Sequence, residues 1–474
     1  MGVERLEFGS SLSGLLVDGV DGTPCVGATI RMTKDKGIVV EVPYLPDRGI
    51  AQFDHVQEWF GSRTPPNNML LLTHEGTISL FDITWSGHSE TWGGSRASVG
   101  SLRPTLTVLG RRDAELAAPL VMNEMHSWPD GLNAWSGLSS VHTERETDEQ
   151  ARVQSVTMTL EASASFTWHQ GDATLTLRAG WLHAPERNGY ERKTTVHDNV
   201  AIVSTFESGP APFWDHFVEH RKVANLLVFL FGRQLSFRKH CLRDDLFTTR
   251  AGDGRVISTP LTELISRNSY RERIAEVPSV KELGNPIAGL HEIGEEGLEA
   301  WANNYETWKR FILPSASILG RNGVYLEDLV ISTSMSMEAA GGLIGERPGE
   351  RATWSNGRRP RPTTATYVYR CIDVLAVQWP ERVTDRAGLS KAIANAYNDV
   401  KHYDRGDFPD HDELHVVSEI SQMIVRLLAL HIAGRGEDLL SIYRESERLY
   451  QIKQVLDAYE LRLDEDGKWI RDSN

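Results

Sequence analysis

The first 210 residues of the chain consist of short apolar or β-branched runs separated by Gly, Pro, Asn and Asp. Runs with such boundaries predict strands. In 155–160 (SVTMTL) and 173–177 (ATLTL) polar and apolar residues alternate, which is the pattern of antiparallel strands with one buried face. Further strands are expected at 37–42, 69–73, 78–84 and 200–207. A sandwich-like or barrel-like sheet is therefore predicted for residues 1–210.

The hydrophobic period changes from two to about 3.6 residues after Pro210 and Pro212. Segment 213–234 is expected to be a buried helix that closes the first half, because its large apolar residues recur at helical spacing. A mixed connector follows to residue 284, and the rest reads as helices, with interruptions at Pro314, 345–362, Pro380 and Pro409. The predicted fold class is α+β: a β-rich half (1–210), a helix and mixed connector (211–284), and an all-α bundle of five or six helices (285–474).

Composition favours a globular protein of two or three domains, with 474 residues, 40% hydrophobic and 24% charged. The longest apolar run, 223–231, is far shorter than the roughly 20 residues of a membrane span. The first residues lack an export signal, so a soluble, cytoplasmic protein without membrane contact is expected. Cys25, Cys241 and Cys371 lie far apart without zinc-ligand spacing, and all three are expected to be buried.

The net charge of −15 disfavours nucleic-acid binding by the surface as a whole. An RNA-binding role therefore needs a local basic patch. The candidates are the cluster Arg238, Lys239 and Arg243 and the cluster Arg358, Arg359 and Arg361. The second cluster lies in 345–362 (GERPGERATWSNGRRPRP), which is rich in Gly, Pro and Arg and is predicted to be a mobile connection between helices.

Common nucleotide, protease, hydrolase and kinase motifs are absent from the sequence. Six tryptophans in the N-terminal half could stack on sugars or bases, but in a β-rich domain most are expected in the core: Trp85, Trp92, Trp128, Trp135, Trp168 and Trp181. His126, Trp128 and Asp130 lie close together near a proline turn, and no mechanism is assigned to them.

One local pattern carries chemistry, the segment 397–403 (YNDVKHY). The preceding residues 389–400 are helical by pattern, so His402 falls in the last turn and Asn398 lies on the same face. An imidazole paired with an amide at a helix end can exchange a proton with a 2′-hydroxyl and orient a phosphate. The simpler interpretation is a histidine that caps the helix.

The chain resembles the ApeA-type anti-phage proteins, in which an ApeA N-terminal domain precedes a HEPN domain. The resemblance rests on the β-then-helix order and on the succession of a helix with Met335–Glu338 (MSME), a helix 367–377, YNDVKHYD and a long helix after Asp412. Asn398 and His402 match the RNxxxH form of the HEPN motif. In the N-terminal half it rests on 14–42, DGLNAWSGL around Trp135, and the helix after Pro212.

The resemblance implies a HEPN endoribonuclease that needs neither metal nor cofactor, acts on RNA such as tRNA, and works as a homodimer or larger homo-oligomer whose paired motifs form one cleft. It implies that His402 carries the proton, with Asn398 beside it, and that an Arg stabilises the phosphoryl charge. Tyr397 stands at that Arg position, so Lys401 or Arg405 supplies the charge or the protein is slow or inactive. A second-choice motif, Arg426 to His431 (RLLALH), has divergent side chains on a helix.

The leading hypothesis is an anti-phage, abortive-infection protein whose β-rich half senses a phage-derived trigger and whose helical half cleaves host or phage RNA. The alternative is a catalytically inactive HEPN-like protein that senses or binds a partner or nucleic acid. A third hypothesis is a sugar- or ligand-binding β-domain with the helices as a dimerisation platform.

Overall fold

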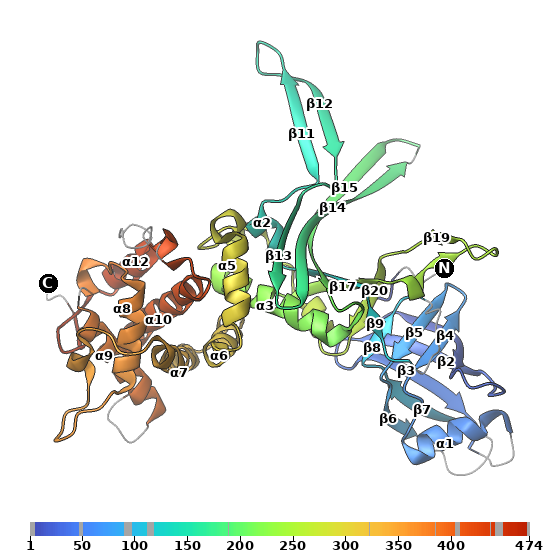
Figure 1. Cartoon of the computed structure of the whole chain (residues 1–474), viewed down its shortest axis with the longest axis horizontal. Coiled ribbons are helices and arrows are strands. Elements are labelled where there is room, and N and C mark those ends of the chain that lie inside the picture. The colour runs from blue at the N-terminus through green and yellow to red at the C-terminus, as the bar shows by residue number, and fades with distance from the viewer. Residues whose placement is uncertain are drawn as a thin grey trace.

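The structure is a computed structural model, which describes residues 5–46, 51–89, 97–110, 118–187, 189–321, 323–383, 385–402, 408–436, 438–440 and 449–471. It places a large antiparallel sheet at one end of the molecule and helices at the other (Figure 1). The predicted α+β class with a β-rich first half is confirmed.

Most strands belong to one sheet, whose neighbouring strands are all antiparallel. Two strands from the predicted connector, β17 and β20, lie in the middle of it. The strand order is β13 (Ser165–Gln170), β14 (Ala173–Arg187), β15 (Arg192–Phe206), β10 (Glu124–Pro129), β17 (Phe237–Arg243), β20 (Thr262–Ser266), β8 (Leu106–Val108), β5 (Thr77–Phe81), β4 (Met69–Thr73), β1 (Ser11–Val17), β2 (Val26–Thr33), β3 (Gly37–Tyr44), β7 (Ser98–Arg103) and β6 (Thr84–Ser89).

The end of the sheet formed by β1 to β7 has its own apolar core, closed by helix α1 (Asp54–Ser62). Phe60 of α1 packs directly on the backbone of β7, where a Cβ on Gly100 would lie only 2.0 Å from its ring. Glycine at this position therefore lets the helix approach the strand closely. Two short strand pairs complete the β-rich part, β9 (Val121–Met122) with β16 (Ala211–Pro212), and β18 (Thr249–Arg250) with β19 (Val256–Ser258).

Helix α3 (Phe213–Phe231) covers one face of the sheet at β10 and β15. It begins after Pro212 and ends at Gly232, whose φ of 68° is readily adopted only by glycine. The predicted buried helix is thus confirmed. One apolar cluster runs from Trp168 on β13 through α3 into the helical half, so this end of the sheet and the helices share a core.

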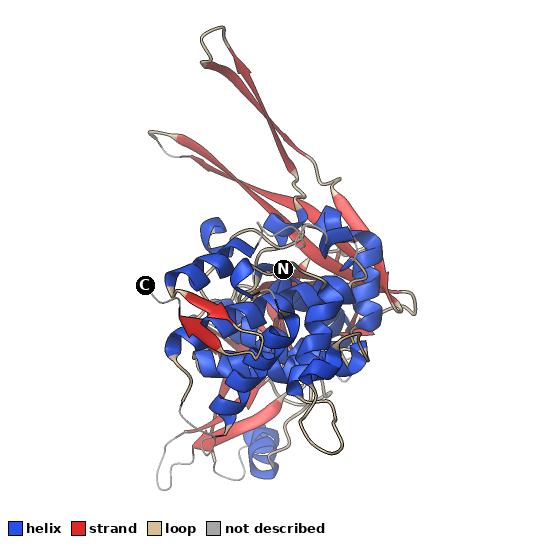
Figure 2. Cartoon of the chain, turned by 90° about the vertical axis from the view of Figure 1, so that its left-hand side faces the viewer, coloured by secondary structure: helices blue, strands red, loops and turns tan. Residues whose placement is uncertain are grey.

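Two β-hairpins project from the body of the protein (Figures 1 and 2). One is formed by β11 (Val141–Thr147) and β12 (Val153–Leu160), the other by the outer ends of β14 and β15. The prediction that 155–160 has a buried face is wrong: Val156 and Met158 are each about half exposed, because no layer of the described structure packs against the hairpin over these residues. The alternation expected for 173–177 is confirmed within β14.

The C-terminal half is a helical assembly in which α7 packs on α6, α8, α9 and α10. The prediction of a break at Pro314 is wrong, since this proline lies inside α6. The described helices of this half are α5 (Leu290–Asn304), α6 (Lys309–Leu319), α7 (Leu326–Ile344), α8 (Thr364–Leu375), α9 (Arg386–Lys401), α10 (His411–Ile432) and α12 (Tyr450–Ala458). They are followed by the hairpin of β21 (Leu461–Leu463) and β22 (Trp469–Arg471). Two short helices lie earlier in the chain, α2 (Leu132–Ser136) and α4 (Val280–Leu283).

Within the segment 345–362, which was predicted to be a mobile connection, Glu350 is held to the bundle. The segment contains a 3₁₀ turn (Glu350–Thr353), and the Glu350 carboxylate accepts hydrogen bonds from Arg370 Nε at 2.7 Å and Arg370 Nη2 at 2.9 Å. Both side chains are almost fully buried. Composition alone does not show that these two charges pair inside the protein.

Among the described helices, α10 alone has the length and apolar composition of a membrane span, and 67% of its most apolar window is buried inside the protein.

Candidate functional site

The predicted motif lies at the C-terminal end of helix α9. Asp385 caps the start of this helix by accepting hydrogen bonds from the backbone of Ala387 and Gly388. The helix ends at Lys401, and the backbone N–H of His402 donates to the carbonyl oxygen of Asn398 at 2.9 Å. The side chains of Asn398 and His402 are both half-buried. The predicted position of His402 at a helix end is confirmed.

Tyr397 points into the bundle, with only 4% of the residue exposed. Its hydroxyl accepts a hydrogen bond from Lys401 Nζ at 2.9 Å, and this ammonium lies 4.9 Å from the centre of the Tyr397 ring. The bond to Tyr397 raises the pKa of Lys401, so the ammonium stays charged. The position that Arg takes in the motif is therefore occupied by a buried tyrosine, Tyr397, whose hydroxyl holds the ammonium of Lys401. Arg405, the other cation considered, lies outside the described residues.

Carboxylates also gather near this helix end. Burial raises the pKa of Asp399, and burial together with Asp410 raises the pKa of Glu413 at the start of α10. Arg471 binds Asp410 at 3.3 Å and Asp412 at 2.7 Å. The site thus combines one imidazole, one amide and one fixed cation with acidic neighbours.

The second-choice motif is structural. Arg426 donates from Nε to the carbonyl of Phe229 at 3.1 Å and from Nη2 to that of Leu230 at 2.8 Å, two carbonyls at the end of α3 that have no partner within the helix. His431 instead lies near the Trp308 ring, and burial lowers its pKa. The structure does not bring the two side chains into one site.

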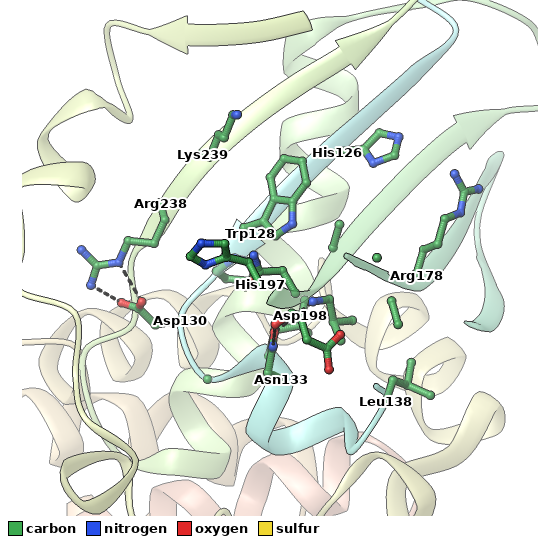
Figure 3. Close-up of a pocket in the computed structure, with 18 of the residues that line it drawn as sticks. His126, Trp128, Asp130, Asn133, Leu138, Arg178, His197, Asp198, Arg238 and Lys239 are labelled. Atoms are coloured by element: carbon green, nitrogen blue, oxygen red, sulfur yellow. Dashed lines mark hydrogen bonds and ion pairs between the residues drawn. The ribbon is translucent and has the colours of Figure 1, made fainter. Parts of the chain in front are cut away.

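A cavity of about 1070 Å³ lies on the face of the sheet opposite α3 (Figure 3). Its floor is formed by β14, β15, β10 and β17, and its walls include helix α2 and residues of 277–283. Three features that the sequence presented separately meet here: His126 with Trp128 and Asp130, the segment 130–138, and the basic cluster Arg238, Lys239 and Arg243. The other basic cluster, 358–361, lies exposed in the helical half.

Three nitrogen donors converge on one oxygen of Glu124 at the edge of this cavity. Arg178 Nη1 lies 3.3 Å and Arg243 Nη1 3.6 Å from Glu124 Oε1, and His126 Nε2 bonds to the same oxygen. The bond from His126 is the main reason why the pKa of Glu124 falls to about 2. Burial lowers the pKa of His126, which therefore donates as a neutral imidazole.

The two carboxylates that line the cavity already have partners. Asp130 accepts from Arg238 Nε at 2.7 Å and from Arg238 Nη2 at 2.5 Å (Figure 3). Asp198 accepts from the hydroxyls of Ser139 and Ser140, each at 2.6 Å. The side chains of Arg178, Lys239 and Arg243 line the cavity and are between 40% and 47% exposed, and they consequently give this surface its charge.

The covered face of the same strands carries a buried histidine network. The Ser127 hydroxyl lies 2.6 Å from His220 Nδ1 and 2.7 Å from His240 Nδ1, and His216 Nδ1 lies 2.7 Å from the Ser204 hydroxyl. Burial lowers the pKa of His240 to about 3 and that of His216 to about 4. These rings are closed off by α3, so they are neutral core groups rather than substrate contacts.

This network should make folding sensitive to mild acid. Below pH 6.5 the unfolded chain protonates His216 and the folded chain does not, so the unfolded state binds more protons and stability falls as the pH falls toward 4. Between pH 7 and pH 5 the protonation of this single residue in the unfolded chain should lower the free energy of unfolding by about 2 kcal/mol. Urea unfolding of the wild type and of His216→Asn at several pH values gives the slope of the free energy of unfolding against pH, which should be smaller in the variant. Equal slopes in the two proteins would contradict a neutral His216.

Several single-residue expectations differ from the structure. Cys25 is exposed, whereas Cys241 and Cys371 are buried as predicted, with pKa values raised by burial. Trp135 and Trp168 lie in the core, but Trp181 is 44% exposed at the cavity, and Trp92 lies outside the described residues. Within the described part of the chain, His, Cys, Asp and Glu side chains form no group of three or more that could hold a metal ion.

Comparison of the chain with protein-family models, with curated proteins and with solved structures finds no match.

Proposed function

We propose that the chain is an endoribonuclease of the HEPN type, which cleaves RNA without a metal ion at the C-terminal end of α9. One observation supports this most strongly: His402 and Asn398 are half-buried at a helix end, and Lys401 holds a permanent cation within the same turn. The role we assign to it is abortive-infection defence, with the β-rich half receiving the phage-derived signal.

The chemistry follows from these groups. His402 accepts the proton of a 2′-hydroxyl, the 2′-oxygen attacks the adjacent phosphorus, and the bond from phosphorus to the 5′-oxygen breaks. The leaving oxygen takes up a proton, so the products carry a 2′,3′-cyclic phosphate and a 5′-hydroxyl. Lys401 stabilises the charge that develops on the phosphoryl oxygens. A second copy of the chain supplies a second imidazole, which allows one ring to accept a proton while the other donates one.

The test is cleavage of an in vitro transcribed tRNA in the presence of EDTA. Wild-type protein should generate 2′,3′-cyclic phosphate ends, and Lys401→Met should lower the rate about 10²- to 10³-fold because a charge donor to the transition state is lost. Lys401→Arg keeps the charge and should keep most of the rate. Equal rates for Lys401→Met and wild type would remove this residue from the mechanism.

A second candidate function, an inactive HEPN-like protein that binds a partner or nucleic acid, is favoured by the burial of Tyr397 and by the carboxylates around Asp399 and Glu413. It predicts that the tRNA remains intact at every enzyme concentration. Cyclic-phosphate products that scale with wild-type protein and are lost in the variants would exclude it.

A further inference from the structure

We propose that the cavity on the open face of β14, β15, β10 and β17 binds a nucleoside polyphosphate or a dinucleotide, with a base stacked on Trp128 and phosphates held by Arg178 and Arg243. This inference concerns a different half of the molecule from the α9 site and does not rest on the proposed ribonuclease function.

The phosphate end is defined by the two guanidinium groups on Glu124. Two positive charges share one carboxylate, which leaves one net positive charge there. Each guanidinium has five N–H donors and presents a planar fork that fits phosphate oxygens. The Arg178 and Arg243 side chains are 40% and 44% exposed, whereas that of Glu124 is 17% exposed. Glu124 therefore positions both cations and leaves their outer donors to the ligand.

The stacking end is defined by Trp128, a half-exposed ring that lies on β10 together with Glu124. Its neighbour His126 lies parallel within 28° at 6.0 Å between centroids, and Lys239, its partner across the strand pair, has Nζ 6.0 Å from the ring centre. Lys239 also lies 3.7 Å from Glu263, which is 8% exposed and bonded to Arg273. A half-exposed aromatic ring with one lysine ammonium over it suits a nucleobase joined to phosphates.

The spacing of the two ends sets the size of the ligand. Trp128 and Glu124 are four residues apart on β10, about 13 Å along a strand. This separation suits a base with a chain of phosphates better than a nucleoside monophosphate. Exposed polar side chains on β15, His197 and Asn199, line the cavity and can contact the sugar hydroxyls.

The cavity fits a small molecule better than a long RNA strand. Its volume of about 1070 Å³ slightly exceeds the range of about 300 to 1,000 Å³ that is usual for ligand pockets. Helix α2 and residues from 277–283 form walls around it. The net charge of −15 also repels a long polyanion more strongly than a compact one.

Isothermal titration of the full chain with ATP, the other three nucleoside triphosphates and a phosphorylated dinucleotide tests the proposal. At least one should bind. Trp128→Leu should weaken binding about 5- to 150-fold, the equivalent of one lost base stack. Arg178→Gln and Arg243→Gln should each weaken it at least about tenfold, the scale of one charged hydrogen bond. Arg255→Gln, which changes an arginine 82% exposed outside the cavity, is the matched control.

Trp128→Phe keeps an aromatic face and should bind the nucleotide with most of the wild-type affinity. Such binding would also show that replacing Trp128 leaves the fold intact. Binding that is unchanged in Trp128→Leu and Arg178→Gln would overturn the proposal, as would no detectable binding of any of these probes at millimolar concentration. If a 20-nucleotide RNA binds more tightly than every small probe, and the same variants abolish this binding, the surface would be an RNA-binding site instead.

Discussion

Replacing His402 with alanine is expected to lower the rate of tRNA cleavage about 10²- to 10⁴-fold, the range that a positioned acid–base group contributes. The side chain is half-buried at the end of α9, and its backbone N–H, which alanine retains, makes the helix-terminal hydrogen bond to Asn398. Thermal unfolding should therefore change little. Initial rates in EDTA, measured with wild type and variant at equal concentration, give the comparison.

His291→Ala provides the matched control, because this histidine is exposed on α5 in the same half of the molecule. It should cleave RNA at the wild-type rate. If His402→Ala also kept the wild-type rate, the α9 site would not be the catalytic site, and any cleavage would have to come from elsewhere in the chain.

The helix end at His402 was predictable from the sequence because its signals are local. Apolar residues recur at helical spacing from Leu389 to Val400, and the structure shows that Leu389, Ile393 and Tyr397 form the buried stripe of α9. The burial of Tyr397 follows from the same period, since it lies four residues after Ile393. The contact between Tyr397 and Lys401 was likewise predictable from the sequence, because residues four apart on a helix are neighbours.

The cavity could not be predicted in the same way. Its cations come from β14 and β17, its tryptophan from β10 and its walls from α2 and 277–283, and only the pairing of strands far apart in sequence joins them. A partial signal did exist. Glu124, His126 and Trp128 alternate along β10 with residues that face α3, and Lys239 and Arg243 alternate likewise along β17. This period of two shows that they share a face, but not that the two strands are neighbours.

Replacing Glu350 with alanine is expected to lower the free energy of unfolding by about 3 to 5 kcal/mol, the cost of leaving one member of a buried ion pair alone. The Glu350 carboxylate accepts two bonds from Arg370 and one from the backbone N–H of Arg347 at 2.9 Å. Arg370 is 7% exposed and would keep its charge without a carboxylate partner in the variant. The segment 345–362 would also lose an attachment to α8. Urea unfolding at pH 7, followed by far-UV circular dichroism, measures the loss.

Two comparisons isolate the cause. Arg152→Ala breaks an exposed pair with Asp148 on the β11–β12 hairpin, where the arginine side chain is 70% exposed, and should lower the free energy of unfolding far less than Glu350→Ala does. The double variant Glu350→Leu/Arg370→Met removes both charges and should be more stable than Glu350→Ala alone, because no unpaired charge is left inside. If Glu350→Ala unfolded at the wild-type urea concentration, Arg370 would have to reach water, and the segment 345–362 would be mobile after all.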